Sequence, residues 1–201
     1  MNMPVTAVGL TLTLALGAAM PAAAAGRSEA RNLWAQANTT AVAGSHRAAF
    51  RGPRGTAGIH GRRTVADGQG DAATASAGAW RGPHGGAAAR GGETSRSSDG
   101  SWQHQSGFAA RGAEGDSVSS HGSASGDGNG HASFARETDA HGVRGSYAGS
   151  TTGASGQGLT HTSQLTGADG RSYLGETSIS KSGITHTGSC SNAAGQAVSC
   201  P

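Results

Sequence analysis

The sequence predicts an all-β protein built from tandem β-hairpin repeats, arranged as an antiparallel meander or as a β-solenoid. Three observations support this prediction. Segments near the C-terminal end repeat each other at an interval of 25 to 26 residues, turn signals recur at about half that interval, and large apolar residues are few. Repeats of this length are typical of chains in which each supersecondary unit stacks on the next.

The segment 1–25 is expected to be a cleavable signal peptide. Residues 5–20 carry no charged side chain, Pro21 ends the run, and the small residues Ala23 and Ala25 fit the cleavage pocket of a signal peptidase. A retained membrane anchor is the alternative, but the run is short for a membrane span and rich in Gly, Thr and Ala. We therefore expect an exported protein (periplasmic, cell-surface or extracellular) with no transmembrane segment in the mature chain.

Residues 26–49 show no turn rhythm, so they are expected to form a disordered or weakly helical linker. Ser28 to Gln36 could form a short helix with Ser28 as its N-cap.

Residues 50–201 are expected to form the glycine-rich hairpin region. Phe50–Gly55 (FRGPRG) matches Trp80–Gly85 (WRGPHG) at an offset of 30 residues. The best-defined repeats lie in 143–201, where Tyr147–Thr152 is echoed by Tyr173–Ser178 and Gly158-Leu-Thr-His-Thr by Gly183-Ile-Thr-His-Thr. Each repeat then corresponds to two strands and two turns.

Turn signals mark the ends of these strands at intervals of about 12 to 16 residues. Asp-Gly and similar pairs supply the positive φ that tight hairpins need. The signals are Pro53–Gly55, Asp67–Gly68, Pro83–Gly85, Asp99–Gly100, Glu114–Gly115, Asp127–Gly128, His141–Gly142, Ser155–Gly156, Asp169–Gly170, Ser182–Gly183 and Ala194–Gly195.

The composition predicts a thin core. After residue 25 the chain has only fifteen Leu, Ile, Val and Phe residues, far fewer than a compact domain of this length contains. A disordered Gly/Ser-rich chain is the alternative. The net charge of only +3 and the scarcity of Pro and Lys favour thin β structure, held by ladder hydrogen bonds and cross-strand Thr, Ser and Tyr pairs.

The two cysteines, Cys190 and Cys200, are predicted to form a disulfide. They flank Asn192–Gly195, a plausible hairpin turn, and are equidistant from Gly195, so they are expected to face each other across the hairpin. A free dithiol or a metal pair is the alternative, although the spacing of ten is not a CxxC motif.

Nine histidines are present, and His161 and His186 occupy equivalent repeat positions, each between two threonines. If the hairpins stack in register, the two imidazoles share a face and could hold a divalent transition metal together with water or a carboxylate. The alternative is that they are half-exposed strand residues. No resident cofactor is expected.

Known enzyme motifs are incomplete or absent in this sequence, so we expect no enzymatic activity. Ser178-Ile-Ser-Lys181 matches S-x-x-K, but the S-D-N element of that enzyme class is absent, as are G-x-S-x-G, a P-loop and H-E-x-x-H. The arginines are spread along the chain and interleaved with acids, so no nucleic-acid partner is expected.

The Tyr-x-Gly-x-Thr and Gly-Leu/Ile-Thr-His-Thr repeats, with the terminal cysteine pair, resemble small exported glycine-rich β-repeat proteins of bacteria that have no assigned activity. The resemblance covers the chain from about residue 140 to its end and transfers no functional residue. We expect a non-enzymatic structural or interaction protein of the bacterial envelope or extracellular space, with envelope polysaccharide or self-association through strand edges as partners. The alternatives are a histidine-based metal-binding exported protein and a largely disordered envelope protein.

Overall fold

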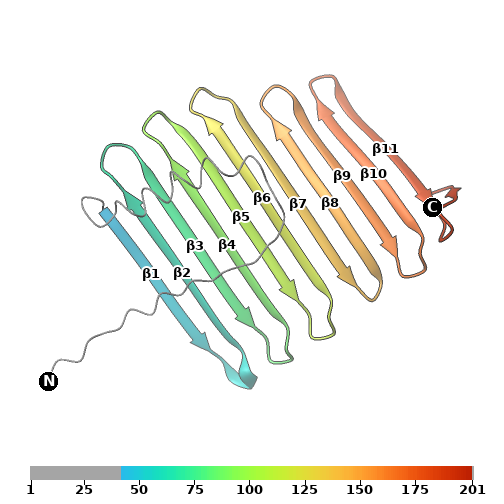
Figure 1. Cartoon of the computed structure of the whole chain (residues 1–201), viewed down its shortest axis with the longest axis horizontal. Helices are drawn as coiled ribbons and strands as arrows, with labels where there is room; N and C mark the ends of the chain where they lie inside the picture. Colours follow the sequence, from blue (N-terminus) through green and yellow to red (C-terminus); the bar gives the residue numbers. More distant parts are fainter. Residues whose placement is uncertain (1–41, 201) are drawn as a thin grey trace.

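The computed structural model describes residues 42–200, which form one antiparallel sheet of twelve strands (Figure 1). Every strand pairs with its neighbours in chain order, from β1 to β12. The prediction of an all-β chain of tandem hairpins is confirmed, and the arrangement is the meander rather than the solenoid. Residues 42–200 are therefore ordered strand and turn, unlike the predicted alternative of a disordered chain.

The strands are of similar length, apart from the short last one. They are β1 (Val42–Arg51), β2 (Ala57–Ala66), β3 (Ala72–Arg81), β4 (Ala87–Arg96), β5 (Ser101–Arg111), β6 (Ser117–Asp127), β7 (Ala132–Gly142), β8 (Gly145–Ala154), β9 (Gly158–Gly167), β10 (Ser172–Ser180), β11 (Gly183–Ser191) and β12 (Ala197–Val198). A single 3-10 turn, Pro53–Gly55, lies between β1 and β2.

The first strand begins earlier than the sequence indicated. β1 starts at Val42, inside the segment 26–49 that was expected to be a linker, and pairs with β2 along its whole length. Its Gly, Ala and Ser content gives little apolar alternation, so pairing with β2 rather than local propensity makes it a strand. The predicted signal peptide and the predicted helix at Ser28–Gln36 lie outside the described residues.

Each predicted turn signal lies in a turn or directly beside one. Most of their glycines have positive φ, for example 77° at Gly68 and 79° at Gly170, which L side chains rarely adopt. Three turns share a further device, in which the Oδ1 atom of Asp67, Asp127 or Asn192 accepts hydrogen bonds from the backbone amides two and four residues later. Local chemistry thus fixes where the strands end.

The sheet is a single layer, and Figure 1 shows its strands running side by side with little change of direction. Within residues 44–200, the buried apolar side chains are Val65 and Ala73, which pair across β2 and β3. Most sheets cover at least one face with a second layer. Here the predicted thin core is confirmed, and cohesion comes mainly from the backbone ladders between neighbouring strands. No helix in the described part is both long and apolar enough to span a membrane.

The predicted disulfide between Cys190 and Cys200 is present, with the two Cα atoms 5.3 Å apart. The expected facing positions are wrong, because Cys190 pairs with Val198 and the hairpin is centred on Ala194. Gly195 supplies the positive φ of the turn without being its centre. The bridge therefore runs diagonally, from Cys190 to the residue two positions beyond its partner.

Candidate interaction surface

The register of the sheet assigns every strand residue to one of two faces. Paired residues of antiparallel strands point to the same face, and successive residues of a strand point to opposite faces. Followed from Phe50 across all eleven pairings, this rule places every aromatic Phe, Trp and Tyr side chain of residues 42–200 on one face, which we call the aromatic face. They are Phe50, Trp80, Trp102, Phe108, Phe134, Tyr147 and Tyr173.

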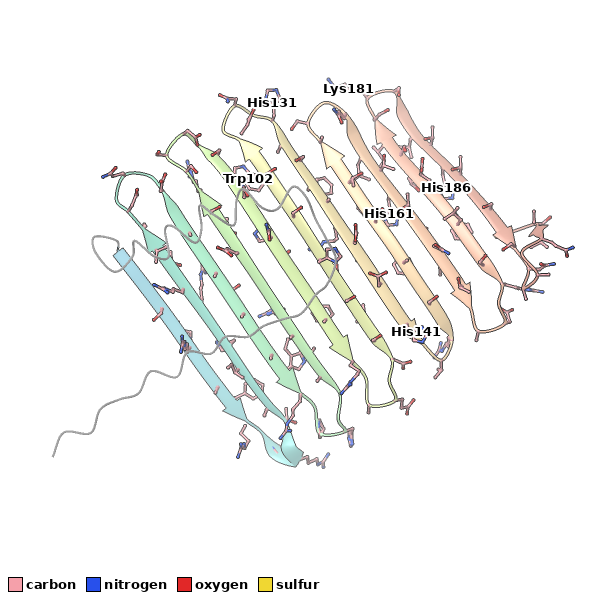
Figure 2. All side chains as sticks on the ribbon, viewed as in Figure 1. Trp102, His131, His141, His161, Lys181 and His186 are labelled. Atoms are coloured by element: carbon pink, nitrogen blue, oxygen red, sulfur yellow. A yellow bond between two sulfur atoms is a disulfide. The ribbon has the colours of Figure 1, made fainter. Side chains whose placement is uncertain are left out.

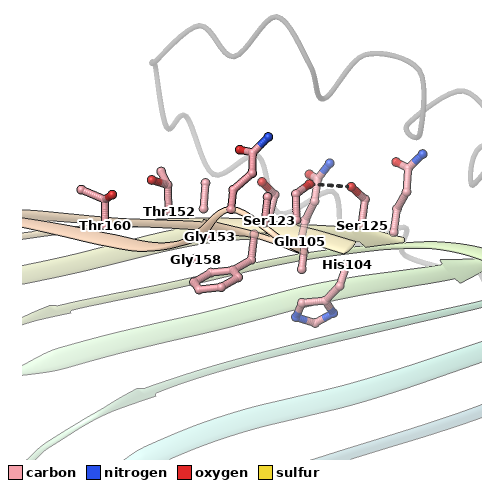
Figure 3. Close-up of a pocket in the computed structure, with 15 residues that line it drawn as sticks. His104, Gln105, Ser123, Ser125, Thr152, Gly153, Gly158 and Thr160 are labelled. Carbon is pink, nitrogen blue, oxygen red and sulfur yellow. Dashed lines mark hydrogen bonds between the residues drawn. The ribbon is translucent and has the colours of Figure 1, made fainter. Parts of the chain in front are cut away.

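The opposite face carries mainly Ser, Thr, Ala and Gln, and we call it the hydroxyl face. Hydroxyl pairs bridge neighbouring strands there, with Oγ of Ser150 2.7 Å from Oγ1 of Thr162. Figure 3 shows the separation, with Ser125 and Thr152 on one side of the sheet and His104 on the other. The two faces therefore offer different chemistry to a partner.

Aromatic rings lie across glycines on the aromatic face. A Cβ atom added to Gly153 would overlap the ring of Phe134, its cross-strand partner. The same holds for Trp102 over its partner Gly126. These rings lie low on the backbone, as in the aromatic rescue of strand glycines. The remaining examples are Phe50 over Gly58, Tyr147 over Gly149 and Tyr173 over Gly175.

One cross-strand row of the aromatic face is apolar from the first strand to the last. It crosses the sheet near the end at which β1 finishes, and apart from the two tyrosine hydroxyls it presents no polar group. The row consists of Phe50, Gly58, Trp80, Ala88, Ala110, Val118, Ala140, Tyr147, Leu165, Tyr173, Cys190 and Val198.

Charged side chains are divided unequally between the faces. Every carboxylate within a strand lies on the hydroxyl face, namely Glu93, Asp127, Glu137, Asp139 and Glu176. The aromatic face instead carries four exposed arginines, Arg62, Arg90, Arg96 and Arg136. Acids of the strands can therefore pair with basic groups only on the other face, as in the 3.0 Å contact between Nε2 of His121 and Oε2 of Glu137.

Arg136 shows how a guanidinium is held on the aromatic face. Its Nη1 donates to Oγ of Ser120 at 2.9 Å, and its Nη2 lies 3.5 Å from Oγ of Ser106. Both acceptors are neutral hydroxyls on β6 and β5. The side chain thus lies across the neighbouring strands, and no carboxylate among residues 42–200 forms an ion pair with it.

Aromatic and basic side chains gather on β1 to β5, and we call Phe50, His60, Trp80, Arg90 and Phe108 the aromatic–basic patch. The three aromatic side chains are 54%, 41% and 36% exposed, respectively. The rings of Trp80 and Phe108 have centroids 6.3 Å apart, and Arg90 pairs with Phe108 across β4 and β5. A shallow hollow near this end of the sheet is lined mainly by residues of the hydroxyl face, such as Ile59, Ala79 and Ala89, although Phe50 and Trp80 also contribute to it.

The predicted metal residues His161 and His186 lie on the aromatic face in the same cross-strand row, with Thr177 of β10 between them (Figure 2). Nδ1 of His161 is 2.9 Å from Oγ1 of Thr151, on the side away from His186. His186 uses both ring nitrogens, at 2.9 Å from Oγ1 of Thr177 and 3.1 Å from the Tyr173 hydroxyl. The structure thus brings the two onto one face and does not bring them into contact.

Two other pairs of histidines lie elsewhere in the sheet. His131 and His141 lie at opposite ends of β7 (Figure 2). His46 and His60 have ring centroids 5.7 Å apart on the aromatic face, a pairing that the sequence analysis missed. Among residues 42–200, no cluster of three or more His, Cys, Asp or Glu residues could hold a metal ion.

The turn at the end of β6 contains the clearest electrostatic effect. The backbone amide of Asn129 and the side chain of His131 hydrogen-bond to Asp127 and hold the pKa of its carboxyl below the ordinary value. This carboxylate organises the turn, because it also accepts from the His131 backbone amide. Its place at an exposed turn indicates a structural role.

Comparison with known protein families, with curated proteins and with solved structures found no match for this chain. The chemistry of the two faces is therefore the basis for assigning a function to this chain.

Proposed function

We propose that this chain is a non-enzymatic structural or interaction protein of the bacterial envelope or extracellular space, and that it acts through the open faces of its sheet. The observation that carries the proposal is the division of side chains between the faces, with all seven described aromatic rings and no strand carboxylate on one of them. A broad, two-sided surface suits binding to an extended partner.

The geometry favours binding over catalysis. Catalytic groups must be held by a rigid shell in a site from which water is excluded. In the part of the chain that the structure describes, both faces of the single layer are open, and Lys181 of the S-x-x-K match is exposed in the turn between β10 and β11 (Figure 2). The Cys190–Cys200 disulfide is compatible with an oxidising compartment outside the cytoplasm.

The exposed edges of the two outer strands also favour self-association of the chain. Among residues 42–200, β1 pairs only with β2, and β12 covers β11 only at Cys190 and Ser191. Within this part of the chain, Gly183–Ser189 therefore presents unpaired backbone groups on one side. Open strand edges of this kind pair with other chains. β11 carries no charged side chain in this stretch, whereas β1 carries two arginines.

The proposal is tested by expressing the full chain in a bacterial host, determining its mature N-terminus by mass spectrometry and locating it by fractionation. We expect a processed chain that begins near Gly26 and sediments with envelope or extracellular material. An unprocessed chain that stays in the cytoplasm would refute the proposal.

Histidine-based metal binding is the second candidate, supported by the contact between the His46 and His60 rings. Zinc titration by calorimetry tests it with two matched double variants, His46→Ala with His60→Ala, and His161→Ala with His186→Ala. Submicromolar binding that one of these pairs abolishes would support the candidate and locate the site. No binding to the unaltered chain would remove it.

A further inference from the structure

We infer that the aromatic face binds an acidic polysaccharide, with sugar rings stacked on the exposed aromatic side chains and acidic groups paired with the arginines beside them. This inference rests on the proposed function and names the class of partner.

The aromatic rings are placed for stacking on a chain of sugars. Phe50, Trp80 and Phe108 come from β1, β3 and β5, which are alternate strands about 10 Å apart, and the rings of Trp80 and Phe108 approach to 6.3 Å between centroids. Each is more than a third exposed. An exposed ring face attracts the slightly positive C–H groups of a sugar ring, which also bury apolar area against it. A polymer that runs across the strands over Phe50 and Trp80 would pass beside Phe108, which lies two residues along β5 from their cross-strand row.

The charges on this face fit an anionic partner. Arg62, Arg90 and Arg136 are exposed, and no carboxylate of any strand shares their face. Guanidinium groups pair with carboxylate or sulfate through two parallel hydrogen bonds, which makes them suited to sugar acids. An acidic partner would therefore supply the carboxylate or sulfate groups that no strand residue provides on this face.

The spacing of the arginines favours a polysaccharide over nucleic acid. Arg62 and Arg90 are two strands apart and Arg90 and Arg136 are three strands apart, which corresponds to about 10 and 14 Å measured across the strands. A polysaccharide with acidic groups on some of its sugars matches such sparse charge. A nucleic acid carries a phosphate on every nucleotide and would leave most of its charge unpaired.

Two other occupants fit the surface less well. A second copy packed on the same face would bury arginines against a surface without carboxylates, which is costly. A membrane requires apolar side chains that reach into the acyl region, whereas the rings of Phe50 and Phe134 lie low over glycines.

The test measures binding of the full chain to alginate, a polymer of uronic acids, and to neutral dextran by calorimetry. The aromatic-face variant combines Arg62→Gln, Arg90→Gln and Arg136→Gln. Its matched control combines three exposed arginines of the hydroxyl face that end alternate strands, Arg51→Gln, Arg81→Gln and Arg111→Gln. Both variants lower the net charge by three.

We expect alginate to bind and dextran not to bind. The aromatic-face variant should weaken alginate binding by about tenfold or more, since three charged hydrogen-bonding groups are lost. Trp80→Ala should weaken it without any change of charge, and the hydroxyl-face control should change it by less than about twofold. Far-UV circular dichroism confirms that each variant keeps the sheet.

Equal losses in the two arginine variants would reduce the effect to net charge and overturn the inference. Equal binding of dextran, or tighter binding to vesicles with anionic lipid or to a single-stranded oligonucleotide, would also overturn it in favour of those partners. Absence of alginate binding by a chain that still fractionates with the envelope would refute this inference alone, whereas retention in the cytoplasm would refute the proposed function.

Discussion

The contact between Phe134 and Gly153 predicts that a single methyl group destabilises the sheet. Gly153→Ala would normally stabilise a strand interior by about 0.5 to 1 kcal/mol, because glycine loses more backbone entropy on folding. Here the added Cβ would overlap the Phe134 ring, so the ring must leave its place on the backbone. Whether Gly153→Ala stabilises or destabilises the sheet therefore depends on how much buried area the Phe134 ring loses.

The loss can be estimated from the burial of the ring. Phe134 is 42% exposed, so more than half of its roughly 200 Å² is buried. At about 25 cal/mol per Å², complete displacement would cost about 3 kcal/mol. A partial displacement, offset by the gain in backbone entropy, leaves an expected net destabilisation of about 1 to 2 kcal/mol.

Urea denaturation followed by circular dichroism measures this effect, and two further variants define its cause. Gly107→Ala is the control, because its added Cβ would meet nothing closer than the Ser120 carbonyl oxygen at 3.8 Å, and it should stabilise the chain. In a Phe134→Ala background, Gly153→Ala should also become stabilising. If Gly153→Ala stabilises the chain with Phe134 intact, the ring does not lie on Gly153 and the reasoning is refuted.

Three further predictions concern the turns and the edge. Replacing Cys190 and Cys200 by serine should destabilise the terminal hairpin by about 2 to 3 kcal/mol, because the unfolded chain regains loop entropy. Amide hydrogen exchange should then become faster in β11 and β12 and not in β1 to β9. Faster exchange throughout the sheet would contradict this local role of the disulfide. The pKa of the Asp127 carboxyl is lowered in the folded chain, so its contribution to stability is present above its unfolded pKa and is lost as pH falls through the folded pKa. Asp127→Asn should therefore remove that part of the loss of stability in acid. An unchanged dependence of stability on pH in this variant would argue against the role of Asp127. Thr185→Lys, on the uncharged edge of β11, should reduce concentration-dependent association in analytical ultracentrifugation, whereas equal association of both chains would exclude this edge.

The positions of the turns and the disulfide could be predicted from the sequence, because each depends on chemistry within a few residues. Glycines with positive φ, such as Gly68 and Gly170, and the Asp or Asn side chains that accept amide hydrogen bonds specify turns locally. The turn signals separate β2 to β12 from one another, whereas β1 lies mostly in the segment 26–49 that was expected to be a linker. The metal pair His161 and His186 remains a prediction, and only their shared face could be derived from the repeat.

The division of chemistry between the faces could not be predicted, because it depends on the length of every turn. Most turns leave three or five residues between the innermost paired residues, so partners have numbers of the same parity. Val143–Arg144 and Lys181–Ser182 are two-residue turns, and each reverses that parity. The aromatic face accordingly carries even-numbered residues through β7, odd-numbered residues from β8 to β10, and even-numbered residues again from β11.

The sequence by itself therefore determined the local structure of this protein: where the turns between the strands lie and which cysteines join. The tertiary structure alone decided that Phe50 and Tyr173 share a face and that the strand carboxylates lie on the other. The physical reason is that the side chains of a strand alternate with a period of two. A difference of one residue in a single turn transfers every later side chain to the opposite face, so the chemistry of a face is a property of the whole register.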